Sequence, residues 1–210
     1  MNPWTPELPL IAILRGIGPD EVLDHVQALH EAGFDAIEIP TNSPDWQVSV
    51  QRVSQAFGES LMIGAGTVLT PEHLTQLSAA GGRLMVTPNT SPALISEAVS
   101  TYGFQVCAGF ATASEAFAAL QAGAQALKLF PSSVFGPDYV KALKAVLPAQ
   151  VPVYAVGGIN PENLGSYVGA GCAGAGLGSD LYRPGQPVAV TRERAQRFVQ
   201  AWQAACPQTH

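Results

Sequence analysis

An alternation of short apolar runs with longer amphipathic segments predicts a single-domain (β/α)₈ barrel over residues 1–210. Three observations support this fold class. Eight apolar runs occur at nearly regular spacing, one for each strand of such a barrel. These runs are apolar in consecutive positions, as strands covered by helices are. No low-complexity linker or shift in composition marks a second domain. A doubly wound open sheet is the alternative, and eight units make it the weaker one.

The expected strands, in chain order, are Leu10–Leu14, Ala36–Ile39, Met62–Ala65, Leu84–Val86, Gln105–Cys107, Ala126–Phe130, Val153–Val156 and Gly174–Leu177. Helix starts are indicated by capping residues and by proline at the first helical position. These signals stand at Pro19–Glu21, Ser43–Asp45, Thr70–Glu72, Ser91–Pro92, Gly136–Asp138 and Asn160–Glu162. Thr112 and Glu115 have the spacing of a capping box. The last helix is expected from about Val190 to Ala205.

Helix ends are indicated by a repeated glycine, which can adopt the left-handed conformation just beyond a helix. These glycines are Gly33, Gly81, Gly123 and Gly171, and an expected strand follows each within a few residues.

Composition argues against several function classes. Charged residues are only 12% of the chain, hydrophobic residues are 47%, and the formal net charge is −6. These values are typical of a compact enzyme and unlike a disordered chain or a nucleic-acid-binding domain. The densest cationic group is Arg192, Arg194 and Arg197, which we interpret as the solvated face of the last helix.

Cysteine usage points to a reducing compartment. Cys107, Cys172 and Cys206 are few, odd in number and widely spaced, without a disulfide or zinc pattern. The N-terminus shows no signal-peptide pattern, and no apolar span is long enough for a membrane helix. We therefore expect a soluble cytoplasmic protein.

Lys128 is one of three lysines, and it lies between Leu127 and Leu129 in an expected strand. Desolvation disfavours an ammonium ion, so this setting favours a neutral amine near neutral pH. A neutral amine attacks ketones to form a Schiff base. The same position also suits an edge-strand lysine whose ammonium group reaches water. Taken alone, the residue leaves both interpretations open.

The carboxyl ends of the strands form the active-site mouth in barrels of this type. The residues expected there include Arg15, Glu38, Thr67, Pro88, Asn89, Lys128, Phe130, Gly157, Gly158, Gly178 and Ser179. His25, His30 and His73 fall on helical segments, and His210 is at the C-terminus. Acidic residues form no tight cluster either. We therefore expect neither a metal nor a cofactor.

The two glycine pairs follow the last two expected strands, where such barrels commonly bind phosphate through backbone N–H groups. They also suit tight turns without a ligand. Arg15 is either an anion contact or part of an ion pair that closes the barrel end. Glu38, between two isoleucines, is either an ion-pair partner or a proton carrier. A general base beside a Schiff-base lysine is what aldol cleavage needs.

Seven segments also have a familiar pattern. They are IAILRGI (11–17), DAIEIP (35–40), MIGAGTVL (62–69), VTPN (86–89), ALKLFPSSVFGP (126–137), YAVGGINPENL (154–164) and GCAGAGLGSDLY (171–182). They span nearly the whole chain, and together they make it similar to the 2-keto-3-deoxy-6-phosphogluconate aldolase family of class I aldolases. The resemblance is strongest to the galactonate-specific branch of that family.

The resemblance implies roles for the mouth residues. Lys128 would form the Schiff base, and Glu38 would act as general acid and base through water. The substrate-binding residues would be Arg15, Thr67 and Pro88 at the pyruvyl carboxylate, Phe130 beside the iminium, and Gly157, Gly158, Gly178 and Ser179 at the phosphate. The resemblance also implies a homotrimer that works without a metal.

Three positions bear on the substrate. The gluconate-specific branch usually has arginine at position 42 and threonine at position 156, where this chain has Asn42 and Val156. Both residues match the galactonate branch, whereas Thr41 departs from it, because leucine is common there. The implied reaction is cleavage of 2-dehydro-3-deoxy-6-phosphogalactonate to pyruvate and glyceraldehyde 3-phosphate, in galactonate breakdown.

Other readings remain open at this point. The gluconate epimer could be the main substrate, or both epimers could be cleaved. A non-covalent sugar-phosphate isomerase or synthase, and a non-catalytic phosphosugar-binding protein, are more remote. Neither of these last two needs an amine and a carboxylate at the strand ends, so Lys128 and Glu38 together disfavour both.

Overall fold

The computed structural model describes residues 6–206, and strands and helices alternate throughout this range. The elements are β1 (Leu10–Ile13), α1 (Val22–Glu31), β2 (Ala36–Pro40), α2 (Trp46–Phe57), β3 (Met62–Gly66), α3 (Pro71–Ala79), β4 (Leu84–Val86), α4 (Pro92–Ser100), β5 (Gln105–Phe110), α5 (Ala113–Gln121), β6 (Ala126–Leu129), α6 (Ser132–Lys144), β7 (Val153–Val156), α7 (Pro161–Gly169), β8 (Gly174–Leu177) and α8 (Val188–Ala205). Every expected strand is present.

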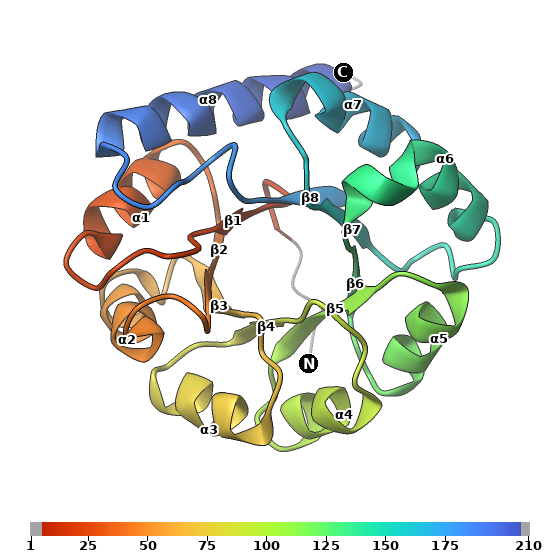
Figure 1. Cartoon of the computed structure of the whole chain (residues 1–210), viewed down its shortest axis with the longest axis horizontal. Coiled ribbons are helices and arrows are strands. Elements are labelled where there is room, and N and C mark those ends of the chain that lie inside the picture. The colour runs from red at the N-terminus through yellow and green to blue at the C-terminus, as the bar shows by residue number, and fades with distance from the viewer. Residues whose placement is uncertain (1–5, 207–210) are drawn as a thin grey trace.

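The strands form a closed parallel barrel in sequence order, with β8 paired to β1. Figure 1 shows the ring of strands with the helices around its outside. This confirms the (β/α)₈ barrel and excludes the open doubly wound sheet, because a closed ring leaves no edge strand. Among the described residues, no helix is long and apolar enough to cross a membrane.

The β5 strand differs most from its expected bounds, since it extends to Phe110 instead of ending at Cys107. Gly109 pairs with Lys128, and Phe110 pairs with Leu129, in the ladder to β6. Glycine is usually a weak strand residue. Here the neighbouring strand supplies the pairing, which a single-strand pattern does not reveal.

The apolar residues form two buried layers. The larger cluster lies between the strands and the surrounding helices. The smaller cluster lies inside the barrel and consists of Ile11, Ile13, Ala36, Leu84, Val86, Cys107, Ala126, Tyr154 and Val156. Side chains alternate between the two faces of a strand. Residues that lie two positions beyond these interior residues therefore point into the barrel nearer its carboxyl end.

Several helix starts form as expected. The Thr112 side chain accepts a hydrogen bond from the Glu115 N–H, and the Glu115 side chain accepts one from the Thr112 N–H, which completes the capping box of α5. Asn160 and Asn163 make the same reciprocal pair at α7. Each pair satisfies backbone donors that the first turn of a helix leaves free.

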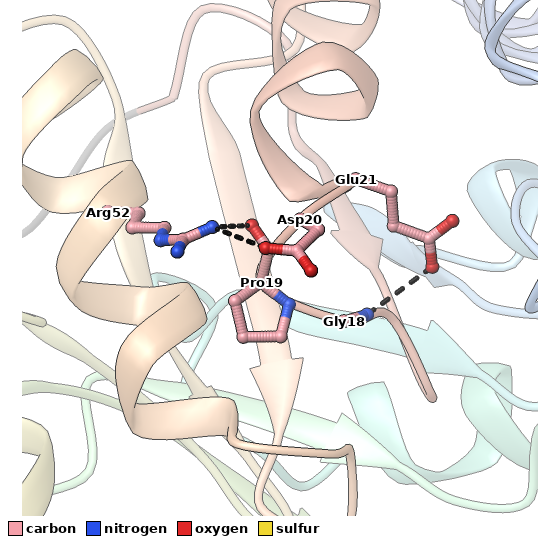
Figure 2. Close-up of polar contacts among 5 residues, drawn as sticks. All are labelled: Gly18, Pro19, Asp20, Glu21 and Arg52. Carbon is pink, nitrogen blue, oxygen red and sulfur yellow. Dashed lines mark hydrogen bonds and ion pairs between the residues drawn. The ribbon is translucent and has the colours of Figure 1, made fainter.

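The start of α1 is held by a different set of contacts. Glu21 precedes the helix without a side-chain cap, and its Oε1 accepts from the Gly18 N–H at 3.3 Å. Arg52 of α2 donates to the Pro19 carbonyl at 2.6 Å and pairs with Asp20 at 3.1 Å (Figure 2). The β1–α1 loop is therefore tied to α2 by these contacts.

Two further helix bounds differ from expectation. The helix expected to start at Gly136 has an extra turn before it, so α6 begins at Ser132, and Gly136 kinks the helix at φ 74°. The last helix begins at Val188, two residues before the expected Val190. Within α8, Arg192 and Arg197 are exposed as expected, whereas Arg194 is only half-exposed and turns toward the loop after β8.

Candidate active site

Lys128 is buried inside the barrel, with only 5% of its surface exposed. It lies two residues beyond the interior residue Ala126, and its strand is flanked on both sides by β5 and β7. A closed barrel has no edge strand, so the interpretation of Lys128 as an edge-strand lysine is wrong. Burial lowers the pKa of Lys128, and the nearby Glu38 carboxylate partly opposes this shift. Burial thereby makes the neutral amine easier to reach than it is for a lysine in water.

Glu38 faces the same interior from β2 and is 1% exposed. Burial raises the pKa of its carboxyl group, while the charges of Lys128 and Arg15 act in the opposite direction. Its Oε2 is buried and has no hydrogen-bond partner among the described residues. Gly66 on the adjoining β3 makes room for this group, because a Cβ atom there would overlap the carboxylate. A buried carboxylate oxygen without a protein donor is available to a bound molecule.

The Cys107 thiol lies one layer below Lys128 in the barrel, since Cys107 pairs with Ala126 in the ladder. Burial raises its pKa to about 12. The thiol therefore stays protonated at neutral pH and does not compete with the amine as a nucleophile.

Arg15 stands at the exposed rim of the mouth, directly after β1. Its Nη1 donates to Asn42 Oδ1 at 2.6 Å, and its Nη2 lies 3.5 Å from Thr67 Oγ1. Thr67 adopts a left-handed conformation with φ 56°. The Thr41 hydroxyl donates to the Thr67 carbonyl at 2.6 Å. Contacts from the β2–α2 loop thus orient both the guanidinium group and the threonine turn.

Pro88 lies after β4, against the backbone of the next strand. A Cβ atom at Gly109 would overlap the Pro88 carbonyl group, so the close approach requires glycine. Thr87 holds this turn, because its hydroxyl accepts from the Gly109 N–H at 2.9 Å and donates to the Asn89 carbonyl at 2.7 Å.

Phe130 covers one side of the amine, with Lys128 Nζ 5.2 Å from the ring centroid. Gly157 packs against the same ring, since a Cβ atom there would lie 3.2 Å from Phe130 Cε2. Gly157 and Gly158 both have positive φ, at 94° and 77°. Val156, just before them, faces the barrel interior near Gly176.

Gly178 and Ser179 follow β8. The Gly178 carbonyl accepts from the N–H groups of Leu181 and Tyr182 at 2.9 Å, which forms one helical turn. Among the described residues, the Ser179 and Asp180 N–H groups have no protein acceptor. Free backbone donors of this kind suit an anion.

The barrel thus brings the predicted residues of all these strand ends to one mouth. The sequence interpretation missed the supporting side chains, namely Thr87, Arg183, Gln186 and Arg194, and it noted Thr41 and Asn42 only as departures from a pattern. The sequence does not identify these contacts, because they depend either on a partner from another element, as for Arg194, or on the exact path of a loop, as for Arg183.

Other hollows lie away from these residues. One of about 820 Å³ lies at the ends of α2 and α3, lined by residues that include Phe57 and Gly81. Another of about 620 Å³ opens near the amino ends of the strands, beside Pro9 and Tyr154. Neither is lined by Lys128 or Glu38, so the reactive groups locate the site better than cavity size does. Within residues 6–206, His, Cys, Asp and Glu form no group of three that could hold a metal ion.

A closed parallel barrel with a buried amine and a buried carboxylate at its mouth has the architecture of a barrel enzyme. The model of the KDPG and KHG aldolase family matches residues 4–190. The chain belongs to this family, and it is therefore an aldolase, a lyase.

The similar proteins point to one branch of the family. The 2-dehydro-3-deoxy-6-phosphogalactonate aldolase of Escherichia coli (strain K12) is 59% identical over 202 residues, covering 96% of this chain and 98% of that protein. The probable 2-dehydro-3-deoxy-6-phosphogalactonate aldolase of Rhizobium meliloti (strain 1021) is 46% identical over 198 residues, covering 94% and 93%. The solved native KDPGal structure is 59% identical, with a TM-score of 0.95 over 97% of this chain and 98% of that one.

Proposed function

We propose that the protein cleaves 2-dehydro-3-deoxy-6-phospho-D-galactonate to pyruvate and D-glyceraldehyde 3-phosphate through a Schiff base on Lys128. The observation that carries this proposal is the burial of Lys128 in a closed barrel, opposite an equally buried Glu38. Two relatives named for this substrate, at 59% and 46% identity, support the choice of reaction.

The reaction begins with the neutral Lys128 amine. It attacks the C2 ketone of the substrate, and loss of water from the carbinolamine leaves an iminium ion. Arg15, Thr67 and Pro88 surround the C1 carboxylate, where the Arg15 guanidinium group offers a charge-assisted contact. Phe130 packs beside the nitrogen and limits its hydration. The iminium ion then withdraws electrons from the C3–C4 bond.

Glu38 carries the proton in the next steps. It accepts the C4 hydroxyl proton through a water molecule, the C3–C4 bond breaks, and glyceraldehyde 3-phosphate leaves. The resulting enamine takes a proton back at C3, and hydrolysis of the iminium ion releases pyruvate and the free amine. Burial raises the pKa of Glu38 above its usual value, and a carboxyl group shifted in this direction is better suited to move the proton both ways.

The phosphate is bound at the other side of the mouth. Gly157, Gly158, Gly178 and Ser179 lie in the turns after β7 and β8, and the free Ser179 N–H is one suitable donor. Val156 faces the middle of the substrate and offers no hydrogen bond to its C4 hydroxyl. The gluconate epimer, or use of both epimers, remains the near alternative, and the side chain at position 156 bears on that choice.

Assembly and location complete the proposal. The resemblance to the aldolase family supports a homotrimer in the cytoplasm that binds a phosphorylated 2-keto-3-deoxy sugar acid. The net charge of −6 argues against nucleic acid as a partner. Light scattering coupled to size-exclusion chromatography measures the assembly, and a monomeric mass would contradict the trimer.

Trapping with borohydride tests the mechanism. Incubation with pyruvate and borohydride should add one reduced pyruvyl group per chain, and peptide mapping should place it on Lys128. Lys128→Met should lose both trapping and turnover, whereas Lys141→Met, on the exposed face of α6, should retain them. Labelling of Lys141 or Lys144 in the unaltered protein would refute the assignment.

A further inference from the structure

The three arginines of α8 differ in their partners. Arg192 pairs with Glu31, and Arg197 pairs with Glu162, at the surface. Arg194 instead donates from Nη1 to the Ser179 carbonyl at 3.3 Å and to Gln186 Oε1 at 3.1 Å. One arginine of the last helix is therefore directed to the loop after β8, where we place the substrate phosphate.

A second guanidinium group reaches the same atom. Arg183 Nε donates to the Ser179 carbonyl at 2.9 Å. Gln186 joins the two arginines, because its Oε1 also accepts from the Arg183 N–H at 3.1 Å. The Gln186 amide nitrogen donates to the Leu181 carbonyl at 3.0 Å. The turn after Gly178 is thus held by two guanidinium groups and one side-chain amide. We call these three residues, Arg183, Gln186 and Arg194, the brace.

This brace continues into the helix layer. Gln186 Nε2 also donates to Thr191 Oγ1 at 2.6 Å, and Thr191 contacts the buried His25 Nδ1 of α1 at 2.8 Å. The Tyr182 hydroxyl donates to Glu21 Oε1 at 3.0 Å. The same Glu21 oxygen accepts from Gly18, as Figure 2 shows. The loop after β8 is therefore held by α1 as well as by α8.

The brace has a consequence for the backbone of the loop. In a trans peptide the C=O and N–H groups point in opposite directions. Since the Ser179 carbonyl accepts from Arg183 and Arg194, the Asp180 N–H points away from both guanidinium groups. It has no protein acceptor among residues 6–206. An anion on that side of the peptide meets an oriented donor with two positive charges behind it.

We propose that Arg183 and Arg194 are positioning residues of the phosphate subsite, which orient the 179–180 peptide and supply a local positive field for the phosphate dianion. This inference rests on the proposed function, since it presumes a phosphorylated substrate at this mouth. The chain carries a net charge of −6, so a local pair of cations offsets a field that otherwise repels such an anion.

The test compares two double variants that remove the same charge. The double variant of Arg183→Met with Arg194→Met removes both cations of the brace. The double variant of Arg192→Met with Arg197→Met removes two other arginines of α8, which pair with Glu31 and Glu162 instead. Activity is measured as the addition of pyruvate to glyceraldehyde 3-phosphate and to unphosphorylated glyceraldehyde. Loss of the oriented peptide donor and of the local positive field predicts a fall of roughly 10- to 100-fold in kcat/KM for the phosphorylated aldehyde, mainly through KM. The unphosphorylated aldehyde should change by less than about twofold.

The control pair should leave the ratio between the two aldehydes unchanged. An equal fall on both aldehydes in the brace variant, or the same change of ratio in the control, would overturn the proposal. If the methionine pair does not fold, Arg183→Lys with Arg194→Lys decides the matter. This pair keeps both positive charges but replaces each planar guanidinium group by an ammonium group. We therefore expect a smaller fall in kcat/KM, confined to the phosphorylated aldehyde. A wild-type ratio in the lysine pair would rule out the positioning role.

Inorganic phosphate separates this inference from the aldolase reaction. Phosphate should raise the melting temperature of the unaltered protein and of the control pair, and much less that of the brace variant. Equal stabilisation of all three proteins would contradict the role of these arginines. Pyruvate trapping on Lys128 is assayed in parallel, and its absence would refute the proposed function without affecting the phosphate measurement.

Discussion

The proposed chemistry depends on two ionisable side chains that share a desolvated interior. Lys128 and Glu38 are both almost fully buried, and each perturbs the pKa of the other. Burial disfavours the charged form of each group, so it moves the two pKa values toward one another. Both the neutral amine and the protonated carboxyl are therefore easier to reach than in water, and perturbed groups of this kind are typical of functional sites.

Glu38→Gln tests the proton carrier. The glutamine keeps the shape of the side chain and cannot exchange the proton, so Schiff-base trapping should persist while turnover falls by roughly 10²–10⁴-fold. Steady-state cleavage and borohydride trapping measure the two steps separately. Glu193→Gln, exposed on α8, is the matched control and should retain activity. Full turnover in Glu38→Gln would refute the role.

Lys128→Met should change how stability depends on pH. The raised pKa of Glu38 means that the folded protein binds its proton more tightly than the unfolded chain, so this group's contribution to stability is lost as pH rises through the folded pKa. Removing the Lys128 charge strengthens that effect, because an unpaired buried carboxylate costs on the order of 3 kcal/mol. Urea unfolding near pH 5 and near pH 8 should show a steeper decline than in the unaltered protein.

A second variant isolates the carboxylate. Adding Glu38→Gln to Lys128→Met removes the titrating group, so the decline with pH should disappear. A slope that persists in the double variant would assign the effect to another residue.

Val156→Thr addresses the epimer preference. The two candidate substrates differ at C4, and a threonine hydroxyl offers a contact there that valine does not. One such contact is worth roughly 1–3 kcal/mol, enough to change a preference without abolishing either activity. We expect the unaltered enzyme to favour the galacto epimer and the variant to shift toward the gluco epimer, measured as the ratio of kcat/KM values. Val146→Thr, at an exposed position, is the control.

An unaltered enzyme that uses the gluco epimer equally well or better would contradict the role of position 156. The assignment would then move to the phosphogluconate reaction.

At the scale of elements, the strands set the direction of each reactive side chain and the helix starts fix the loops between them. Glu38 pairs with Gly64, and Lys128 pairs with Gly109 and Tyr154. Gly66, two residues beyond Gly64 on β3, leaves space for the Glu38 carboxylate, and Gly109 lets the Pro88 carbonyl group approach β5. The capping boxes of α5 and α7 fix the points at which these two helices begin after β5 and β7.

Thr112→Ala tests one of these helix starts. The substitution removes a hydroxyl that accepts from the Glu115 N–H at 3.3 Å, and loss of such a cap costs about 1 kcal/mol. Chemical denaturation should show that decrease in the free energy of unfolding. Thr101→Ala, exposed at the end of α4, removes a hydroxyl that makes no capping hydrogen bond and should change stability less. Equal losses in both variants would contradict the capping contribution.

At the scale of the whole molecule, closure of the ring creates the site. The β8–β1 pairing brings the loop after β8, where we propose that the phosphate binds, beside the loop after β1 that carries Arg15, although these segments lie at opposite ends of the chain. Closure also removes the edge strand on which Lys128 would otherwise reach water. The mouth is consequently a property of the complete barrel.

Extended chelation tests the chemistry of the complete molecule. The described residues offer no cluster of metal ligands, and the proposed reaction uses an amine as its electron sink. Activity should therefore survive prolonged incubation with a chelator followed by desalting. Loss of activity that a divalent ion restores would overturn the Schiff-base mechanism.

The features that the sequence predicts correctly are those that depend on residues close together in the chain. Strand positions follow from apolar runs, and the capping box of α5 follows from residues three apart. Lys128 is conspicuous because it interrupts an apolar run in a chain with three lysines. The end of β5 and the extra turn of α6 were mispredicted, because pairing with a neighbouring strand and a kink at Gly136 override the local pattern.

By itself, the sequence determined the repeating unit, the barrel, the resemblance to an aldolase family and the residues at the strand ends. These properties depend on neighbours along the chain, whose spacing sets which face of a strand or helix is apolar. Only the tertiary structure decided that Lys128 is enclosed, that Gly66 makes room for Glu38, and that Arg194 reaches Ser179. Burial and side-chain partners depend on segments far apart in the sequence, and these come together only when the barrel closes.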